Sequence, residues 1–214
     1  EASETRENIL AVATREFADK GLAGARIDEI ADATASSKRM IYYYFGSKDQ
    51  LYRAVLERAY QAIRDQEQSA RFEELEADAA LRGVIGHNFD YHHDHPEFVR
   101  LVMNENVHHG EHIASIDGLK ERNRSAIDQL AAILAKGTAQ GLFRPGIDPV
   151  DLHMTISALS FYNVSNRYTF RHNFGVDFSQ PETRARRREQ IVECVMAWVA
   201  TGVSAGLATG VTKG

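Results

Sequence analysis

Apolar residues recur at intervals of three and four along most of this 214-residue chain, which is the spacing that places them on one face of an α-helix. The first stripe predicts a helix over residues 5–20 that ends at Gly21. A second stripe, over residues 27–34, predicts a shorter helix whose acidic residues lie on the opposite face. The pattern at the start of the chain therefore favours short helices joined by tight turns.

Serines at two places predict the starts of the next two helices. Ser36 or Ser37 can accept a hydrogen bond from the free N–H groups of a helix over residues 38–44. Ser47 begins an S-x-x-Q capping box, so a fourth helix, over residues 47–67, follows the glycine that ends the third. This fourth helix is expected to be the only continuous element between the first part of the chain and the rest.

The second half of the chain shows the same spacing in longer segments. Pro96 separates two of them, and the turn GLFRPGIDP separates two others. Helices are predicted over residues 78–95, 97–107, 116–139, 149–170 and 182–202. The chain is therefore expected to be all-α, with about nine helices.

The last two predicted helices are apolar on more than one face. Such a helix needs a second surface to cover it, so we expect these two to pack against their counterparts in a second copy, as a four-helix bundle. The residues assigned to this dimer interface are Ile156, Leu159, Ile191, Val195, Trp198 and Val199.

The most distinctive stretch is TASSKRMIYYYFGSKDQL, at residues 34–51. It combines three basic side chains with four consecutive aromatic residues and has no acid before Asp49, which suits a phosphate-rich surface. Two short helices around a turn, with a basic second helix, form the helix-turn-helix arrangement. With I-D-E-I-A-D-A before it and S-K-D-Q-L at its end, this part of the chain resembles the DNA-binding domain of the TetR family of transcriptional regulators.

The resemblance implies a helix-turn-helix DNA-binding domain in residues 1–50 and a helical ligand-binding and dimerisation domain in residues 68–206. Residues 207–214 are expected to form a loose tail. A protein of this kind is expected to bind a pseudo-palindromic operator as a homodimer, and to repress transcription until a small-molecule inducer releases it. The alternatives are a regulator or activator that needs no inducer, and a helical interaction module.

Three residues depart from the family pattern. Ala25 stands where the family has a threonine that caps the second helix, and the neighbouring Arg26 is expected to take over its phosphate contact. Ala35 replaces the glycine of the turn, and Arg39 replaces a small residue. Because Arg39 is expected to contact bases, the operator sequence does not follow from the resemblance.

The DNA contacts divide into those to bases, which specify the DNA sequence, and those to phosphates, which position the protein on the DNA. Lys38, Arg39 and Met40 are predicted to face base edges, while the other assigned side chains hold phosphates or cap the helix. Tyrosines can bury the ring and extend the hydroxyl to a phosphate, so packing and phosphate contact stay equal alternatives for the aromatic run. The residues assigned to DNA binding are Arg26, Ser37, Lys38, Arg39, Met40, Tyr42, Tyr43 and Lys48.

A pocket for the small molecule is expected between the inward faces of the helices in the second half, from residue 78 to residue 170. Aromatic rings beside Asn, Ser and His predict a mostly apolar ligand with a few hydrogen-bonding groups, and ordinary core is the alternative for each residue. The candidates are Phe89, His92, Met103, Asn106, Leu130, Leu134, Phe161, Tyr162, Ser165 and Asn166.

Composition narrows the picture further. The net charge of −5 argues against a protein that coats nucleic acid, so the basic charge is local. The single cysteine permits no internal disulfide, and the absence of an apolar leader or span predicts a cytoplasmic protein without a membrane partner. Because the sequence contains no P-loop and no G-x-G-x-x-G motif, we expect no enzyme and no cofactor.

Two clusters have plain interpretations. Glu105, His108, His109 and His112 are close enough in sequence to suggest a metal site, but Gly110 interrupts them, so we expect no metal. The arginines at residues 184–188 are expected to be solvated and partly paired with Glu182 and Glu189, rather than to form a second DNA-binding patch.

Overall fold

A computed structural model describes residues 2–202 of the chain. Over these residues, ten α-helices and two short 3₁₀ helices follow one another, and no β-strand forms apart from one isolated bridge. The all-α prediction is confirmed, although the α-helices number ten rather than about nine. No described helix is both long enough and apolar enough to cross a membrane.

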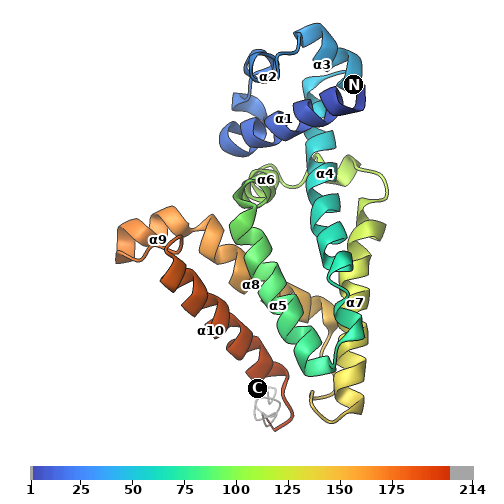
Figure 1. The fold of residues 1–214 in the computed structure, drawn as a ribbon, viewed down its shortest axis with the longest axis vertical. Coiled ribbons are helices and arrows are strands. Elements are labelled where there is room, and N and C mark those ends of the chain that lie inside the picture. Colours follow the sequence, from blue (N-terminus) through green and yellow to red (C-terminus); the bar gives the residue numbers. More distant parts are fainter. Residues whose placement is uncertain (1, 203–214) are drawn as a thin grey trace, which may run out of the picture.

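The first three helices and the start of the fourth form one unit at the top of Figure 1, and the fourth continues down into the body. They are α1 (Ala2–Gly24), α2 (Ile27–Ala33), α3 (Lys38–Phe45) and α4 (Lys48–Ser69). Gly21 has φ of 67°, so the helical path breaks where the sequence predicts it, and a last turn follows within α1. The stripe on α1 packs with the inner faces of the other three helices, around the fully buried Phe17, Ile41 and Tyr52.

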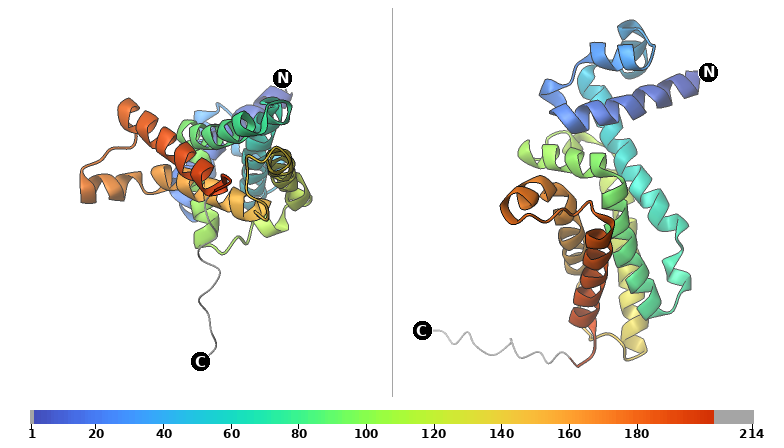
Figure 2. Two further views of the ribbon diagram at one scale, coloured as in Figure 1. Left: turned by 90° about the horizontal axis from the view of Figure 1, so that it is seen from below. Right: turned by 60° about the vertical axis from the view of Figure 1, so that its left-hand side comes forward.

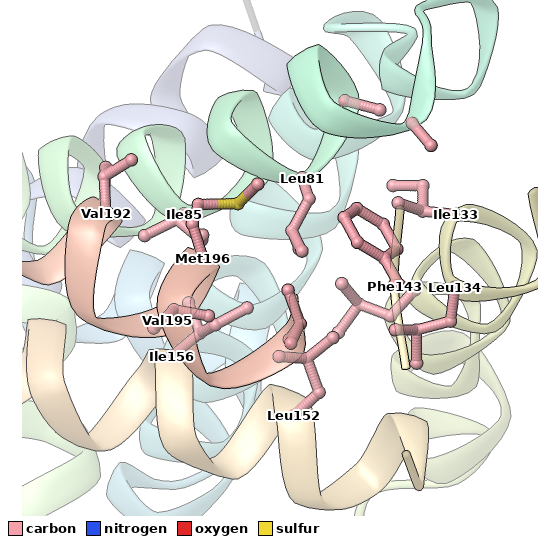
Figure 3. Close-up of a cluster of buried hydrophobic side chains, with 14 of the residues drawn as sticks. Leu81, Ile85, Ile133, Leu134, Phe143, Leu152, Ile156, Val192, Val195 and Met196 are labelled. Atoms are coloured by element: carbon pink, nitrogen blue, oxygen red, sulfur yellow. The ribbon is translucent and has the colours of Figure 1, made fainter. Parts of the chain in front are cut away.

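The remaining helices pack around a second apolar cluster. They are α5 (Ala77–Asp94), α6 (Pro96–Val107), α7 (Leu119–Ala139), α8 (Pro149–Ser165), α9 (Arg167–Phe174) and α10 (Pro181–Val199), with 3₁₀ turns at Phe72–Glu74 and Ile113–Ser115. Leu81 and Ile85 of α5 meet side chains of α7, α8 and α10 in this cluster (Figure 3).

Two helix boundaries differ from the prediction for local reasons. The helix expected over residues 149–170 is broken at Asn166, whose ψ of 7° leaves the helical region, and α9 then projects from the body (Figure 1). The last helix ends at Val199, because Ala200 is extended and pairs with Phe143 in an antiparallel bridge.

Most of the residues predicted for the dimer interface are buried within their own chain. Ile156, Ile191, Val195 and Val199 are at most 2% exposed and belong to the apolar cluster of their own chain (Figure 3). Leu159 and Trp198 are partly buried and pack against the same cluster. The buried apolar residues of α8 and α10 pack against α5, α7 and each other, which the spacing within one helix cannot reveal.

Helix α6 lies directly beneath α1 (Figure 2) and supplies a second connection between the two halves. Leu101 of α6 is buried in the N-terminal apolar cluster, and Asn104 donates a hydrogen bond to the carbonyl oxygen of Phe17 at 3.2 Å. Arg100 forms an ion pair with Asp19. Helix α4 is therefore the only covalent connection between the two halves of the molecule, but the packing of α6 against α1 also holds them together.

Candidate DNA-binding surface and ligand pocket

The turn between α2 and α3 is fixed by short-range hydrogen bonds. Of the two candidate caps, Ser37 is the one used: its hydroxyl accepts from the N–H of Met40 at 3.1 Å. Ser36 instead donates to the carbonyl oxygen of Thr34 at 3.4 Å. Ala35 has φ of 51°, a left-handed conformation that disfavours a side chain and favours the glycine that the family has there.

The outward face of α3 carries most of the residues assigned to DNA. Lys38, Arg39 and Met40 are exposed, and Tyr43 is the most exposed large apolar residue of the helix, at 80%. Tyr42 is 45% exposed. Thus the aromatic run is divided: two tyrosines lie on the surface, while Phe45 is buried beneath the Arg6 guanidinium, 5.1 Å from its ring centroid.

The basic residues on this surface have acidic neighbours. The Lys38 ammonium lies 2.5 Å from the Asp28 carboxylate of α2, and that hydrogen bond lowers the pKa of Asp28. Arg26 is exposed and lies 3.8 Å from the same carboxylate. Arg26 precedes α2 without capping it by its side chain, and its N–H donates to Glu16 at 3.3 Å.

Lys48 occupies the first turn of α4, next to the end of α3. The capping prediction is correct in one direction, because the Ser47 hydroxyl accepts from the N–H of Gln50 at 3.1 Å. The reciprocal bond of a capping box is not made, because the N–H of Ser47 donates to the carbonyl oxygen of Phe45 at 2.9 Å rather than to the Gln50 side chain. The helix N-terminus and the lysine therefore share one corner of the surface, where both attract an anion.

A cavity of about 580 Å³ lies between α4, α5, α6 and α8. Three predicted residues line it, namely His92, Asn106 and Phe161. The lining residues that the sequence analysis did not assign are Tyr60, Ile63, Arg64, Asn88, Phe98, Val102, His153, Met154, Ser157 and Ala158. The volume is that of a typical small-molecule pocket.

The other pocket candidates lie elsewhere. Phe89, Leu130 and Leu134 belong to the apolar cluster, and Leu134 also borders a separate groove beside the 144–149 turn. Met103 and Tyr162 are exposed, at 39% and 48%. At the break between α8 and α9, the Ser165 hydroxyl donates to the Asn166 side-chain oxygen at 2.7 Å. None of these seven residues lines the cavity between α4, α5, α6 and α8.

Burial controls the charge inside the cavity. It lowers the pKa of His92 to about 4, with smaller effects from the neighbouring His93 and His153, so the imidazole is neutral at pH 7. Burial also lowers the pKa of His153. Arg64 is 7% exposed, and its Nη1 lies 2.7 Å from the Glu67 carboxylate, whose pKa burial raises and Arg64 lowers.

The histidine and arginine clusters outside the pocket have structural contacts. Glu105 is 1% exposed and accepts from the N–H of Ile113 at 3.0 Å, and His112 Nδ1 lies 3.1 Å from its other oxygen. Within residues 2–202, no three His, Cys, Asp or Glu side chains gather closely enough to hold a metal ion.

The arginines of α10 have partners other than those predicted. Arg184 and Arg188 pair with Asp90 of α5 at 3.3 and 2.9 Å, and Arg184 also reaches Asp94 at 2.9 Å. These ion pairs connect the first turns of α10 to the last turns of α5, the end of α5 from which α6 follows (Figure 1).

An outward-facing basic recognition helix, joined to a helical body with an apolar pocket, defines a DNA-binding transcription regulator. A family model described as bacterial regulatory proteins, tetR family, matches residues 9–55. A second model, described as the tetracyclin repressor-like C-terminal domain, matches residues 78–195. The chain belongs to the TetR family of bacterial transcriptional regulators.

Individual relatives agree with this assignment. The HTH-type transcriptional repressor NicS of Pseudomonas putida is 36% identical over 185 residues, which cover 86% of this chain and 87% of NicS. The HTH-type transcriptional repressor SCO4008 of Streptomyces coelicolor is 32% identical over 160 residues, covering 75% of this chain and 78% of that one. The crystal structure of SCO4942 from Streptomyces coelicolor superposes with a TM-score of 0.68 at 28% identity, covering 91% and 98% of the two chains.

Proposed function

We propose that the protein is a repressor that binds a pseudo-palindromic operator as a homodimer and leaves it when a small molecule enters the pocket. One observation carries the proposal: the pocket is lined by α4 and α6, and both helices contact the helix-turn-helix unit. A ligand that changes the position of either helix changes the spacing of the two recognition helices. These must match successive major grooves about 34 Å apart.

The direction of regulation follows the relatives, because both NicS and SCO4008 are named transcriptional repressors. A protein that acts on chromosomal DNA works in the cytoplasm, and its ligand serves as a signal rather than as the substrate of an enzyme. Base contacts are assigned to Lys38, Arg39 and Met40. Phosphate contacts are assigned to Arg26, Tyr42, Tyr43 and Lys48, with Ser37 holding the start of α3.

The dimer contact is assigned to the exposed apolar side chains of α8 and α9. Tyr162, Tyr168 and Phe174 are 48%, 53% and 67% exposed, although each is large and apolar. Phe170 connects Tyr162 with Phe174, because its ring lies 6.2 Å from the first and 4.7 Å from the second. A contiguous set of exposed rings is typical of a surface that another protein covers.

The proposal is tested by selecting genomic fragments with the full-length protein and sequencing the bound DNA. The expected result is an inverted repeat whose half-sites are separated by one helical turn, bound by one dimer in sedimentation experiments. Bound fragments without a two-fold repeat would contradict the dimeric operator. A reporter gene placed behind the selected site should be silent with the protein and active without it, whereas an activator gives the reverse.

A further inference from the structure

Three side chains that line the pocket carry a buried polar atom without a hydrogen-bond partner in the described chain. These atoms are Arg64 Nε, Asn88 Oδ1 and His92 Nδ1. The three residues are 7%, 5% and 3% exposed, so bulk water does not satisfy them. Buried polar groups in folded proteins are almost always paired. Five other buried polar atoms of the described chain also lack a partner, but only these three belong to side chains that line this cavity, where a polar ligand could pair them.

Arg64 has donors to spare. Its Nη1 is engaged by Glu67 at 2.7 Å, but Nε remains unpaired. The Nε side of a guanidinium presents two parallel N–H groups, which match the two oxygens of a carboxylate. Among the described residues that line the pocket, Arg64 carries the only charge at neutral pH, because burial keeps His92 and His153 uncharged. A cationic ligand would therefore meet a like charge without an acid in the lining.

Aromatic rings form part of the remaining lining, beside aliphatic side chains. The His92 ring is stacked on Phe98, with centroids 6.0 Å apart, and meets Phe161 edge-on at 5.7 Å. Tyr60 lies edge-on to Phe98 at 5.3 Å. Flat rings held at these distances form walls that suit a planar apolar ligand.

We propose that the pocket binds a small aromatic carboxylic acid that carries one further hydrogen-bond donor. The carboxylate lies against the free edge of Arg64, the donor is bound by Asn88, and the ring lies among Phe98, Phe161 and His92. This assignment rests on the proposed function, because it names the chemical class of the inducer for the same pocket.

The experiment is a calorimetric titration of the full-length protein with matched acid and amide pairs: 4-hydroxybenzoate with 4-hydroxybenzamide, and 2-naphthoate with 2-naphthamide. Each amide keeps the shape of its acid and removes the charge. We expect at least one acid to bind about 10-fold or more tightly than its amide, since hydrogen bonds between charged groups are about twice as strong as neutral ones. Amides that bind as well as their acids, or a complete failure of the acids to bind, would overturn the assignment.

Single-residue variants test which side chain causes the preference for acid over amide. Arg64→Met should abolish the difference between acid and amide, whereas Arg82→Met, at an exposed arginine of α5 paired with Asp78, should preserve it. Because Arg64 is buried and its replacement can unfold the protein, Asn88→Ala provides an independent variant. It should keep the preference for acid over amide and lose the preference for 4-hydroxybenzoate over benzoate. An unchanged preference for 4-hydroxybenzoate would overturn the role of Asn88.

Operator binding separates this inference from the proposed function. Fluorescence anisotropy of labelled operator is measured with each acid and amide. If an acid releases the operator and this release requires Arg64, the result supports both the inducer role of the pocket and the ligand class. An acid that binds but leaves the operator complex intact contradicts the inducer role of the pocket and keeps the ligand class. Release by the amides to the same extent as by the acids keeps the inducer role and overturns the ligand class.

Discussion

The side-chain amide of Asn104 donates a hydrogen bond to the backbone carbonyl oxygen of Phe17, and this contact fixes the last turn of α6 to α1. On the neighbouring turns of α6, Val102 and Asn106 line the pocket. One short helix therefore contacts both the proposed ligand and the core of the DNA-binding unit. Any movement of α6 on ligand binding must be transmitted to α1 or must break this hydrogen bond.

Asn104→Ala should weaken the coupling between ligand and operator. A coupling free energy of about 1–3 kcal/mol lowers operator affinity 5- to 150-fold when ligand is bound, and linkage requires the same factor for ligand affinity when operator is bound. Calorimetric titration of a releasing ligand, with and without operator, measures this factor in the wild type and the variant. Gln61→Ala, on the exposed face of α4, is the control and should retain the wild-type factor. Equal factors in all three proteins would show that the Asn104 contact carries no coupling.

Lys48 and Arg39 should affect DNA binding in different ways. Lys48→Ala removes a phosphate contact, so it should weaken operator and random DNA alike and reduce the log–log salt slope by about one. Arg39→Ala should instead relax sequence preference at one or two positions, by about 1–3 kcal/mol each. Competition titrations at several salt concentrations distinguish the two outcomes. A Lys48 variant that loses only its preference for operator would refute the assignment.

Ala35→Gly should stabilise the helix-turn-helix. An L-residue in the left-handed region costs about 1–2 kcal/mol, and glycine recovers most of this while losing some conformational entropy, so a gain of about 0.5–1 kcal/mol is expected. The matched control is Ala132→Gly, at an exposed position in the interior of α7, which should destabilise by about 0.5–1 kcal/mol. Urea unfolding followed by circular dichroism measures both. A destabilising Ala35→Gly would mean that the backbone of the turn is not left-handed.

The dimer contact predicts a clear contrast between α8–α9 and the buried face of α10. Tyr168→Glu and Phe174→Glu should give folded monomers that no longer bind operator, because each half-site alone supplies too few contacts. Val195→Glu should instead unfold the protomer, since Val195 is 1% exposed within its own core and an unpaired buried charge is costly. Analytical ultracentrifugation with circular dichroism distinguishes the two cases. Dimers that persist in both exposed variants would place the interface elsewhere.

His92 should make stability depend on pH. Burial lowers its folded-state pKa to about 4, below the unfolded value of 6.5, so the unfolded state binds the proton first as pH falls. The stability that neutral His92 contributes to the folded state is therefore fully present above pH 6.5 and is lost as pH falls towards 4. By linkage, the wild type should lose about 2 kcal/mol from this group between pH 7 and pH 5. His92→Phe should reduce that loss and exposed His108→Gln should not, as urea unfolding at the two pH values will show.

The sequence predicted the elements near the helix-turn-helix well because their signals are local. The caps at Ser37 and Ser47 and the break at Gly21 depend on a few neighbouring residues. The sequence could not show that Val195 is buried within its own chain, because an apolar side chain looks the same whether its own chain or a second chain covers it. Arg64 was missed since it lies in a charged run typical of a solvated helix, and only the tertiary fold places α5 and α8 beside it.

The ion pair between Lys38 and Asp28 has a consequence for how the protein searches the chromosome. On the proposed DNA surface, the Asp28 carboxylate is an intramolecular competitor for the cation that would contact DNA. Any DNA must displace this carboxylate before Lys38 is available, and random sequence offers fewer base contacts to offset that loss. The cost of displacing the carboxylate is the same wherever Lys38 contacts DNA, so the competitor weakens transient binding to random sequence without changing the relative advantage of the operator.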